Sequence, residues 1–235
     1  MGPGSKEDRT FRAVSVISES DVIVGYSRYV DLIRDLIGEK KVVSTGMMRE
    51  RERCSEALGM TSNGFKVSLV SSGDPGVYGM AGLAIELRKS MGISIPIEIV
   101  PGVTAASSAA AAMGAPLMLD FAVISLSDLL VPWDMIKQRL EAVANADLVV
   151  ALYNPRSKKR VNQLEQAAEI FRKARSADTP VGIATSVGTP EQTVVFSDLE
   201  RFLEIDINMR SLVIIGNSTS RIIDSFFVTP RGYLS

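Results

Sequence analysis

Apolar residues in the first half of the chain form short continuous runs that alternate with segments of helical spacing. Asp21–Tyr26 and Phe65–Ser71 are runs typical of buried strands, and Arg28–Ile37 carries apolar residues at helical spacing before Gly38. Strands separated by helices of this length predict a parallel sheet covered by helices. The other elements predicted in this half are a charged, exposed helix over Arg49–Leu58, helices over Tyr78–Met91 and Gly102–Met113, and a strand over Ile95–Val100.

Gly114 and Pro116 interrupt this pattern and predict a domain boundary, with an N-terminal α/β domain over residues 1–115 and a C-terminal α/β domain over residues 116–235. The later strands lie closer together, which predicts a mixed sheet with some antiparallel pairing. The predicted fold class is therefore α/β, with a mainly parallel first sheet and a mixed second sheet. The elements predicted here are strands over Phe121–Leu126, Asp147–Tyr153, Val181–Thr185, Thr193–Ser197 and Ser211–Ile215, and helices over Trp133–Val143, Ser157–Arg175 and Asp198–Leu203.

Composition narrows the chemistry that this chain can perform. The formal net charge of the 235 residues is −1, which argues against a surface built to coat nucleic acid. Cys54 is the only cysteine, so no intramolecular disulfide forms, as fits a reducing cytoplasm. Histidine is absent, which excludes Ser-His-Asp and Cys-His catalysis and His-ligated zinc. We expect a cytoplasmic protein with no metal site and no nucleic-acid or membrane partner.

Two turns follow predicted strands and precede predicted helices, where ligands bind in open α/β sheets. In Ser71–Gly79 (SSGDPGVYG), glycines allow close backbone approach and Asp74 can accept hydrogen bonds from a ribose or an amine. A capped turn in which Asp74 serves only the following helix explains the same residues. In Val100–Ala106 (VPGVTAA), Thr104 offers a hydroxyl and an N–H near a helix start, although an N-capped core helix is the alternative.

Two further segments carry candidate chemistry. Ala151–Arg160 (ALYNPRSKKR) delivers Tyr153 and Asn154 to the end of a buried strand. The basic side chains that follow could bind carboxylates, or they could form a solvated helix face. They are Arg156, Lys158, Lys159 and Arg160. The last segment, Gly2-Pro3-Gly4-Ser5, is uninformative alone and could be the remnant of an expression tag.

Taken together, these segments resemble the tetrapyrrole methylase family along essentially the whole chain. Gly73-Asp74-Pro75 matches the Gly-Asp-Pro loop of the family, Pro101 to Ala105 match its Pro-Gly turn, and Met1-Gly2-Pro3-Gly4 matches the end of its Gly-x-Gly-Pro-Gly loop. Further segments are similar to the branch that methylates C17 of a corrin precursor, either precorrin-3B or cobalt-precorrin-3. They are Ser44-Thr45-Gly46-Met47, Ser71–Leu87, Ile124–Trp133, Ala151–Arg160 and Ile214–Arg221.

The resemblance implies an S-adenosylmethionine-dependent methyltransferase of cobalamin biosynthesis, with ring contraction accompanying methylation. It implies two α/β domains with the active site in the cleft between them, a small-molecule tetrapyrrole substrate and a homodimer. By matched position, the residues expected to bind the cofactor are Pro3, Gly73, Asp74, Val77, Thr104, Ala105, Tyr153 and Asn154, with Ser186 closing the site. Asp128, Tyr153 and Lys158 are the candidate acid–base residues, and Arg49, Lys158 and Lys159 are the candidate partners of substrate carboxylates.

The strand that precedes Gly-Pro-Gly in the family is missing from this sequence. We hypothesise that Met1 is internal to a Gly-Met-Gly-Pro-Gly loop and that the natural start lies upstream. Two alternatives to C17 methylation stay open. One is another tetrapyrrole C-methyltransferase, acting at C11, at C20 or on a uroporphyrinogen. The other is an inactive ligand-binding homologue that lacks the first strand.

Overall fold

The computed structural model describes residues 1–157 and 160–233, which form two compact units, Met1–Ala105 and Ala106–Ser235. Almost all of helix α6 (Ala105–Met113) therefore belongs to the second unit. The sequence pattern predicted the domain boundary later, after residue 115. No helix of the described residues is long and apolar enough to cross a membrane.

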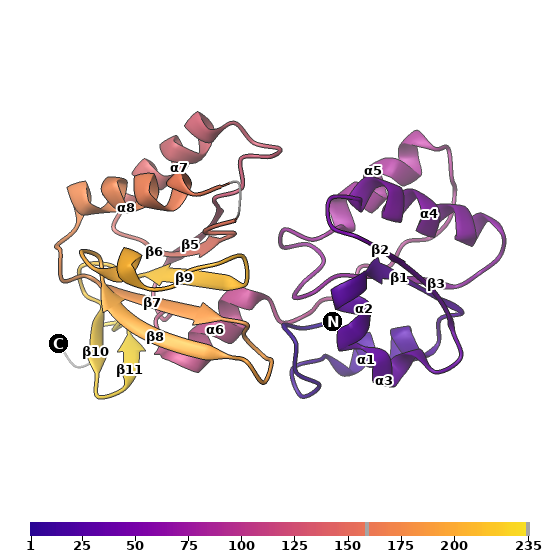
Figure 1. Ribbon diagram of the computed structural model, residues 1–235, viewed down its shortest axis with the longest axis horizontal. Helices are drawn as coiled ribbons and strands as arrows, with labels where there is room; N and C mark the ends of the chain where they lie inside the picture. The colour runs from indigo at the N-terminus through magenta and orange to yellow at the C-terminus, as the bar shows by residue number, and fades with distance from the viewer. Residues whose placement is uncertain (158–159, 234–235) are drawn as a thin grey trace. The chain divides into compact units, whose positions relative to one another are not determined.

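The first unit is built on a three-stranded parallel sheet in the order β2-β1-β3. Its central strand β1 is almost completely buried, because helices lie on both sides of the sheet (Figure 1). Helices α4 and α5 lie on one side and α1, α2 and α3 on the other (Figure 1). The elements are α1 (Phe11–Ser18), β1 (Val22–Tyr26), α2 (Ser27–Leu32), α3 (Arg34–Ile37), β2 (Lys41–Thr45), α4 (Glu50–Ser62), β3 (Val67–Val70) and α5 (Ala81–Ser90).

One prediction for the first unit was wrong, and two were confirmed only in part. The strand expected over Ile95–Val100 does not form, because no strand of the described residues pairs with this segment; the Ile95 carbonyl accepts instead from Arg88 Nη1 at 2.7 Å. The helix expected over Arg28–Ile37 breaks at Ile33, where the backbone leaves the helical region (φ −116°, ψ 20°). The charged helix α4 is not simply exposed, since it buries Arg53 almost completely along with its apolar face.

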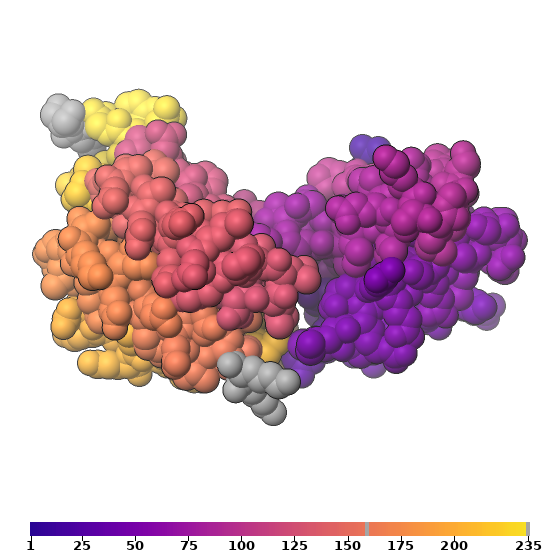
Figure 2. Space-filling model, turned by 90° about the horizontal axis from the view of Figure 1, so that it is seen from above, coloured from indigo at the N-terminus to yellow at the C-terminus, as the bar shows by residue number. Residues whose placement is uncertain are grey.

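The second unit is built on a five-stranded mixed sheet in the order β5-β6-β9-β7-β8. Only β5 and β6 pair in parallel, so the predicted mixed sheet is confirmed. Helices α7 and α8 cover one face of this sheet (Figure 1), and Figure 2 shows their outer side in rose to orange. The main elements are β5 (Phe121–Ser125), α7 (Trp133–Asn145), β6 (Val149–Tyr153), α8 (Asn162–Ala174), β7 (Pro180–Thr185), β8 (Thr193–Asp198), the 3-10 helix η1 (Phe202–Glu204) and β9 (Ser211–Ile215).

The other face of this sheet packs against α6 and a small sheet of β4 (Gly114–Ala115), β10 (Arg221–Ile223) and β11 (Phe226–Val228). Gly182 of β7 makes this close packing possible, because a Cβ atom there would lie 2.5 Å from Met113 Sδ and 3.1 Å from Phe227 Cδ1. Helix α8 begins at Asn162, later than the predicted Ser157, because Ser157 and Arg160 form a turn in which the Ser157 N–H donates to the Arg160 carbonyl at 2.9 Å.

We expect the core beneath α7 and α8 to dominate the stability of the second unit. Phe171 of α8 is fully buried there among leucine, isoleucine and valine side chains. Phe171→Ala should lower the free energy of unfolding by about 3–5 kcal/mol, because it removes a buried ring and leaves a cavity. Phe11→Ala is the matched control, since Phe11 is 97% exposed, and should change it by less than about 0.5 kcal/mol. Urea denaturation measures both, and equal effects would contradict this description of the core.

Candidate functional site

Two loops of the first unit meet beyond the end of β3. The Asp74 carboxylate joins them, with Oδ1 accepting from the Gly76 N–H at 2.7 Å and Oδ2 accepting from the Gly102 N–H at 3.0 Å. Gly73 adopts a left-handed backbone conformation (φ 65°), which suits glycine. Asp74 therefore binds the following turn and also ties that turn to a loop 28 residues further along the chain.

A third segment, at residues 2–3, joins the same cluster. Gly2 and Gly73 exchange backbone hydrogen bonds of 3.2 and 2.7 Å, and Pro3 follows directly. The segments approach so closely that a Cβ atom on Gly102 would lie 2.3 Å from the Gly73 carbonyl oxygen. Only glycine fits at this position without displacing backbone.

The structure brings together the cofactor residues that the sequence predicted in this unit. The Val77 N–H donates to the Asp74 carbonyl at 3.3 Å, and a Cβ atom on Gly73 would lie 3.7 Å from Thr104 Cα and 3.8 Å from the Ala105 nitrogen. Among the described residues, the side chain of Arg49 forms its hydrogen bonds with Glu52 and not with this cluster. It is exposed before α4, where its Nε donates to Glu52 Oε2 at 2.6 Å.

In the second unit, strands β5, β6 and β7 all end at one edge of the sheet. β5 is parallel to β6, and both β6 and β7 are antiparallel to β9, so all three run in the same direction. Side chains link neighbouring ends, with Asn154 Nδ2 donating to Ser125 Oγ at 3.0 Å. Carboxyl ends of strands are where open α/β sheets bind ligands.

Asn154 and Ser186, the residues directly after β6 and β7, both have left-handed backbones, with φ values of 52° and 54°. Such conformations cost free energy in residues other than glycine and cluster at ligand-binding sites. Ser186 is 7% exposed, and its hydroxyl has no hydrogen-bond partner among the described residues. A buried hydroxyl without a partner is unfavourable, so a ligand that supplied one would be stabilised there.

The Tyr153 hydroxyl holds the start of α6. It accepts a hydrogen bond from the Ala106 N–H at 2.8 Å, satisfying one of the amides that a helix leaves unpaired in its first turn. This contact gives Tyr153 a structural role at the end of β6.

The other sequence candidates near this edge have different surroundings. Asp128 is exposed, and its Oδ2 accepts a hydrogen bond from Gln163 Nε2 at 2.8 Å. Lys158 and Lys159 lie outside the described residues. The predictions for these three residues stay predictions.

The sequence did not distinguish Arg160 from the other basic residues of its segment. Arg160 is buried, with Nε donating to the Asn154 carbonyl at 3.1 Å and Nη1 donating to Ser127 Oγ at 3.3 Å. Burial lowers the pKa of its guanidinium, and the negative charge of Asp128 opposes that shift. No pattern in the sequence marked Arg160, because its two acceptors come from tertiary and turn contacts at Ser127 and Asn154.

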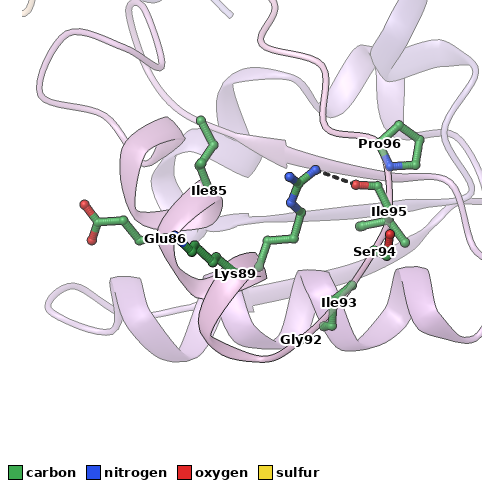
Figure 3. A pocket seen from close by; sticks show the side chains of 9 residues that line it. Ile85, Glu86, Lys89, Gly92, Ile93, Ser94, Ile95 and Pro96 are labelled. Carbon is green, nitrogen blue, oxygen red and sulfur yellow. Dashed lines mark hydrogen bonds between the residues drawn. The ribbon is translucent and has the colours of Figure 1, made fainter.

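An open depression of about 580 Å³ lies elsewhere in the first unit, between the end of α5 and residues 92–96 (Figure 3). Its lining is mainly aliphatic, from Ile85, Ile93 and Ile95, and the hydrogen bond from Arg88 to the Ile95 carbonyl lies beside it. None of the residues that the sequence predicted for the site lines this depression.

Residues 1–203 match the family described as Tetrapyrrole (Corrin/Porphyrin) Methylases. The chain is 42% identical over 233 residues to the "Probable cobalt-factor III C(17)-methyltransferase" of Salmonella typhimurium, covering 99% of this chain and 97% of that relative. It is 45% identical over 237 residues to the "Cobalt-factor III methyltransferase" of Priestia megaterium; the alignment covers 99% of this chain and 44% of that relative. It is 37% identical over 240 residues to the "Precorrin-3B C(17)-methyltransferase" of Sinorhizobium sp; the alignment covers 99% of this chain and 94% of that relative.

Among solved structures, the methyltransferase CobJ superposes with a TM-score of 0.90 at 36% identity, covering 97% of this chain and 96% of that one. The uroporphyrin-III C-methyl transferase of Thermus thermophilus, complexed with S-adenyl homocysteine, superposes with a TM-score of 0.67, covering 92% of this chain and 94% of that one. Its identity is 22%, so that likeness shows the fold alone.

The close approach of the first-unit loops is testable with glycine substitutions. Gly102→Ala should destabilise the protein by about 1–3 kcal/mol, because the new methyl group meets the Gly73 carbonyl. Gly82→Ala in α5, where a Cβ atom would meet nothing within 4 Å, should instead stabilise it by about 0.5–1 kcal/mol. Chemical denaturation distinguishes the two, and a neutral Gly102→Ala would mean that the loops are not so close.

Proposed function

Because the chain belongs to the tetrapyrrole methylase family, we propose that it transfers a methyl group from S-adenosylmethionine to C17 of a corrin precursor, precorrin-3B or cobalt-precorrin-3, in cobalamin biosynthesis. The similarity along the whole chain to relatives whose names state this reaction carries the proposal. We further propose that the methylation accompanies ring contraction and that the protein is a cytoplasmic homodimer, as the family resemblance implies.

The residues present fit such a donor. When bound, S-adenosylmethionine supplies an electrophilic methyl group on a sulfonium, and the acceptor is a ring carbon that is itself nucleophilic. The protein then needs mainly to position the two reactants and exclude water. The chain contains no histidine, and this chemistry requires no strong base.

We assign the positioning of the donor to the two sets of strand-end residues. In the first unit, Asp74 and Gly102 hold the loops so that backbone can approach a ligand closely. In the second unit, the Ser186 hydroxyl is buried and lacks a partner among the described residues, and this observation favours a polar ligand atom beside it. The full set proposed for the cofactor is Pro3, Gly73, Asp74, Val77, Thr104, Ala105, Tyr153, Asn154 and Ser186.

Acid–base help in ring contraction is proposed for Asp128, Tyr153 and Lys158. Tyr153 is the best placed of the described candidates, because its hydroxyl is fixed by the Ala106 N–H at the end of β6. Arg49, Lys158 and Lys159 are proposed to bind substrate carboxylates, and Arg49 would have to exchange Glu52 for the substrate.

Incubation with cobalt-precorrin-3 and methyl-labelled S-adenosylmethionine tests the reaction. We expect one labelled methyl group on C17, located by mass spectrometry and NMR, because the relatives with this specificity match along the whole chain. Label on C11 or C20 would identify a different C-methyltransferase. Absence of S-adenosylhomocysteine binding in calorimetry would favour an inactive homologue and refute the proposal.

Ser186→Ala separates a binding role from a structural one. Removing a buried hydroxyl that has no partner among the described residues should leave the free energy of unfolding of the ligand-free protein unchanged or raise it by about 1 kcal/mol. The same change should weaken S-adenosylhomocysteine binding by roughly three- to tenfold, the cost of a lost neutral hydrogen bond. Unchanged affinity would show that Ser186 does not contact the cofactor.

A further inference from the structure

The buried guanidinium of Arg160 links the ends of two strands. Its Nε donates to the carbonyl of Asn154, directly after β6, and its Nη1 donates to the hydroxyl of Ser127, two residues after β5. The residue is only 8% exposed. Arg160 therefore carries a positive charge at the edge of the sheet where β5, β6 and β7 end.

No carboxylate among the described residues forms an ion pair with Arg160. Asp128 is close enough to favour the positive charge of Arg160, but its carboxylate accepts a hydrogen bond from Gln163 instead. Arg156, in the same segment, is paired with Glu165. Within the described part of the chain, Nη2 of Arg160 has no partner and is not among the buried unpaired atoms, so its N–H groups reach the surface, where a carboxylate from outside the chain can pair with them.

Arg160 also differs from the buried Arg53 and Arg175 in how many of its N–H groups form hydrogen bonds. Arg53 has a hydrogen-bond acceptor on each of its three nitrogens, and both Nη atoms of Arg175 bond to carbonyls. A guanidinium has five N–H donors, and in the part of the chain that the structure describes Arg160 uses two. Both N–H groups of its Nη2 remain for an acceptor, in the planar geometry that suits a carboxylate.

The neighbouring loop supplies the apolar surface that a tetrapyrrole ring needs. Leu129 and Leu130 follow Ser127 closely in sequence and are 69% and 96% exposed. The base of their loop is held at Ser127 by Arg160 and at Asp128 by Gln163. Exposed leucines two and three residues from the serine that Arg160 holds match a ligand with a flat apolar ring and carboxylate side chains.

We infer that Arg160 binds a carboxylate side chain of the tetrapyrrole substrate, with Leu129 and Leu130 against the macrocycle. This inference rests on the proposed function and adds a residue to the substrate site. The amino-acid end of the methyl donor also carries a carboxylate. The leucines favour the ring substrate, because they offer nothing to a charged amino acid.

The test uses uroporphyrin III as the tetrapyrrole probe, with fluorescence titration of the full chain. Arg160→Gln should weaken its binding about tenfold or more, because a charge-assisted hydrogen bond is lost. Arg160→Lys should weaken it less, since the charge remains without the planar fork. Arg139→Gln is the matched control, removing the same charge from an exposed position on α7, and should bind as the wild type does.

S-adenosylhomocysteine affinity, measured by calorimetry, should be unchanged in all three variants, which also shows that they are folded. The inference is overturned if Arg160→Gln binds uroporphyrin III as tightly as Arg139→Gln, or if it loses S-adenosylhomocysteine instead. A wild-type protein that binds neither ligand would refute the proposed function together with the inference. Wild-type binding with an unaffected Arg160→Gln variant would refute the inference alone.

Discussion

Buried arginines hold the loops that follow strands in both units, and the candidate region of the second unit depends on one of them. In the first unit, Arg53 donates to Thr45 Oγ1 and to the Gly46 carbonyl, both at 2.8 Å, where β2 ends. In the second unit, Arg160 joins the segments that follow β5 and β6. Strand ends expose backbone carbonyls, and a guanidinium can bind several of them at fixed geometry. Arg53 has an acceptor on each of its three nitrogens, whereas the Nη2 of Arg160 has none among the described residues.

The sequence predicted most strands of both sheets correctly. β1 and β6 are continuous apolar runs that the fold buries, and the largely apolar β3 and β5 are partly buried. Strands β2, β10 and β11 and helix α1 were not predicted. β2 and β10 are mostly exposed, so their composition carries little signal, although Thr10 at the start of α1 is a recognisable N-cap. The run over Ile95–Val100 alternates like a strand, but a strand also requires a paired neighbour, which local pattern cannot supply.

For the site, sequence motifs located the loops but not their contacts. The two interpretations of Asp74, as a turn residue and as a ligand-facing group, were alternatives in the sequence. The structure shows that its carboxylate serves the local turn at Gly76 and also reaches Gly102, a contact that only the folded chain creates. The same holds for Arg160 and Ser127, which are 33 positions apart. Burial and unused donors depend on tertiary packing, which is why the basic segment could not be resolved into individual roles.

The central claim is that the loops after the strands, and no other surface, bind the methyl donor. Amide NMR of the isotope-labelled protein during titration with S-adenosylhomocysteine tests this most directly. We expect the chemical shifts of the backbone amides to change mainly at residues 73–77, 101–105, 153–154 and 186. Shifts confined to residues 85–96, around the aliphatic depression in Figure 3, would contradict it.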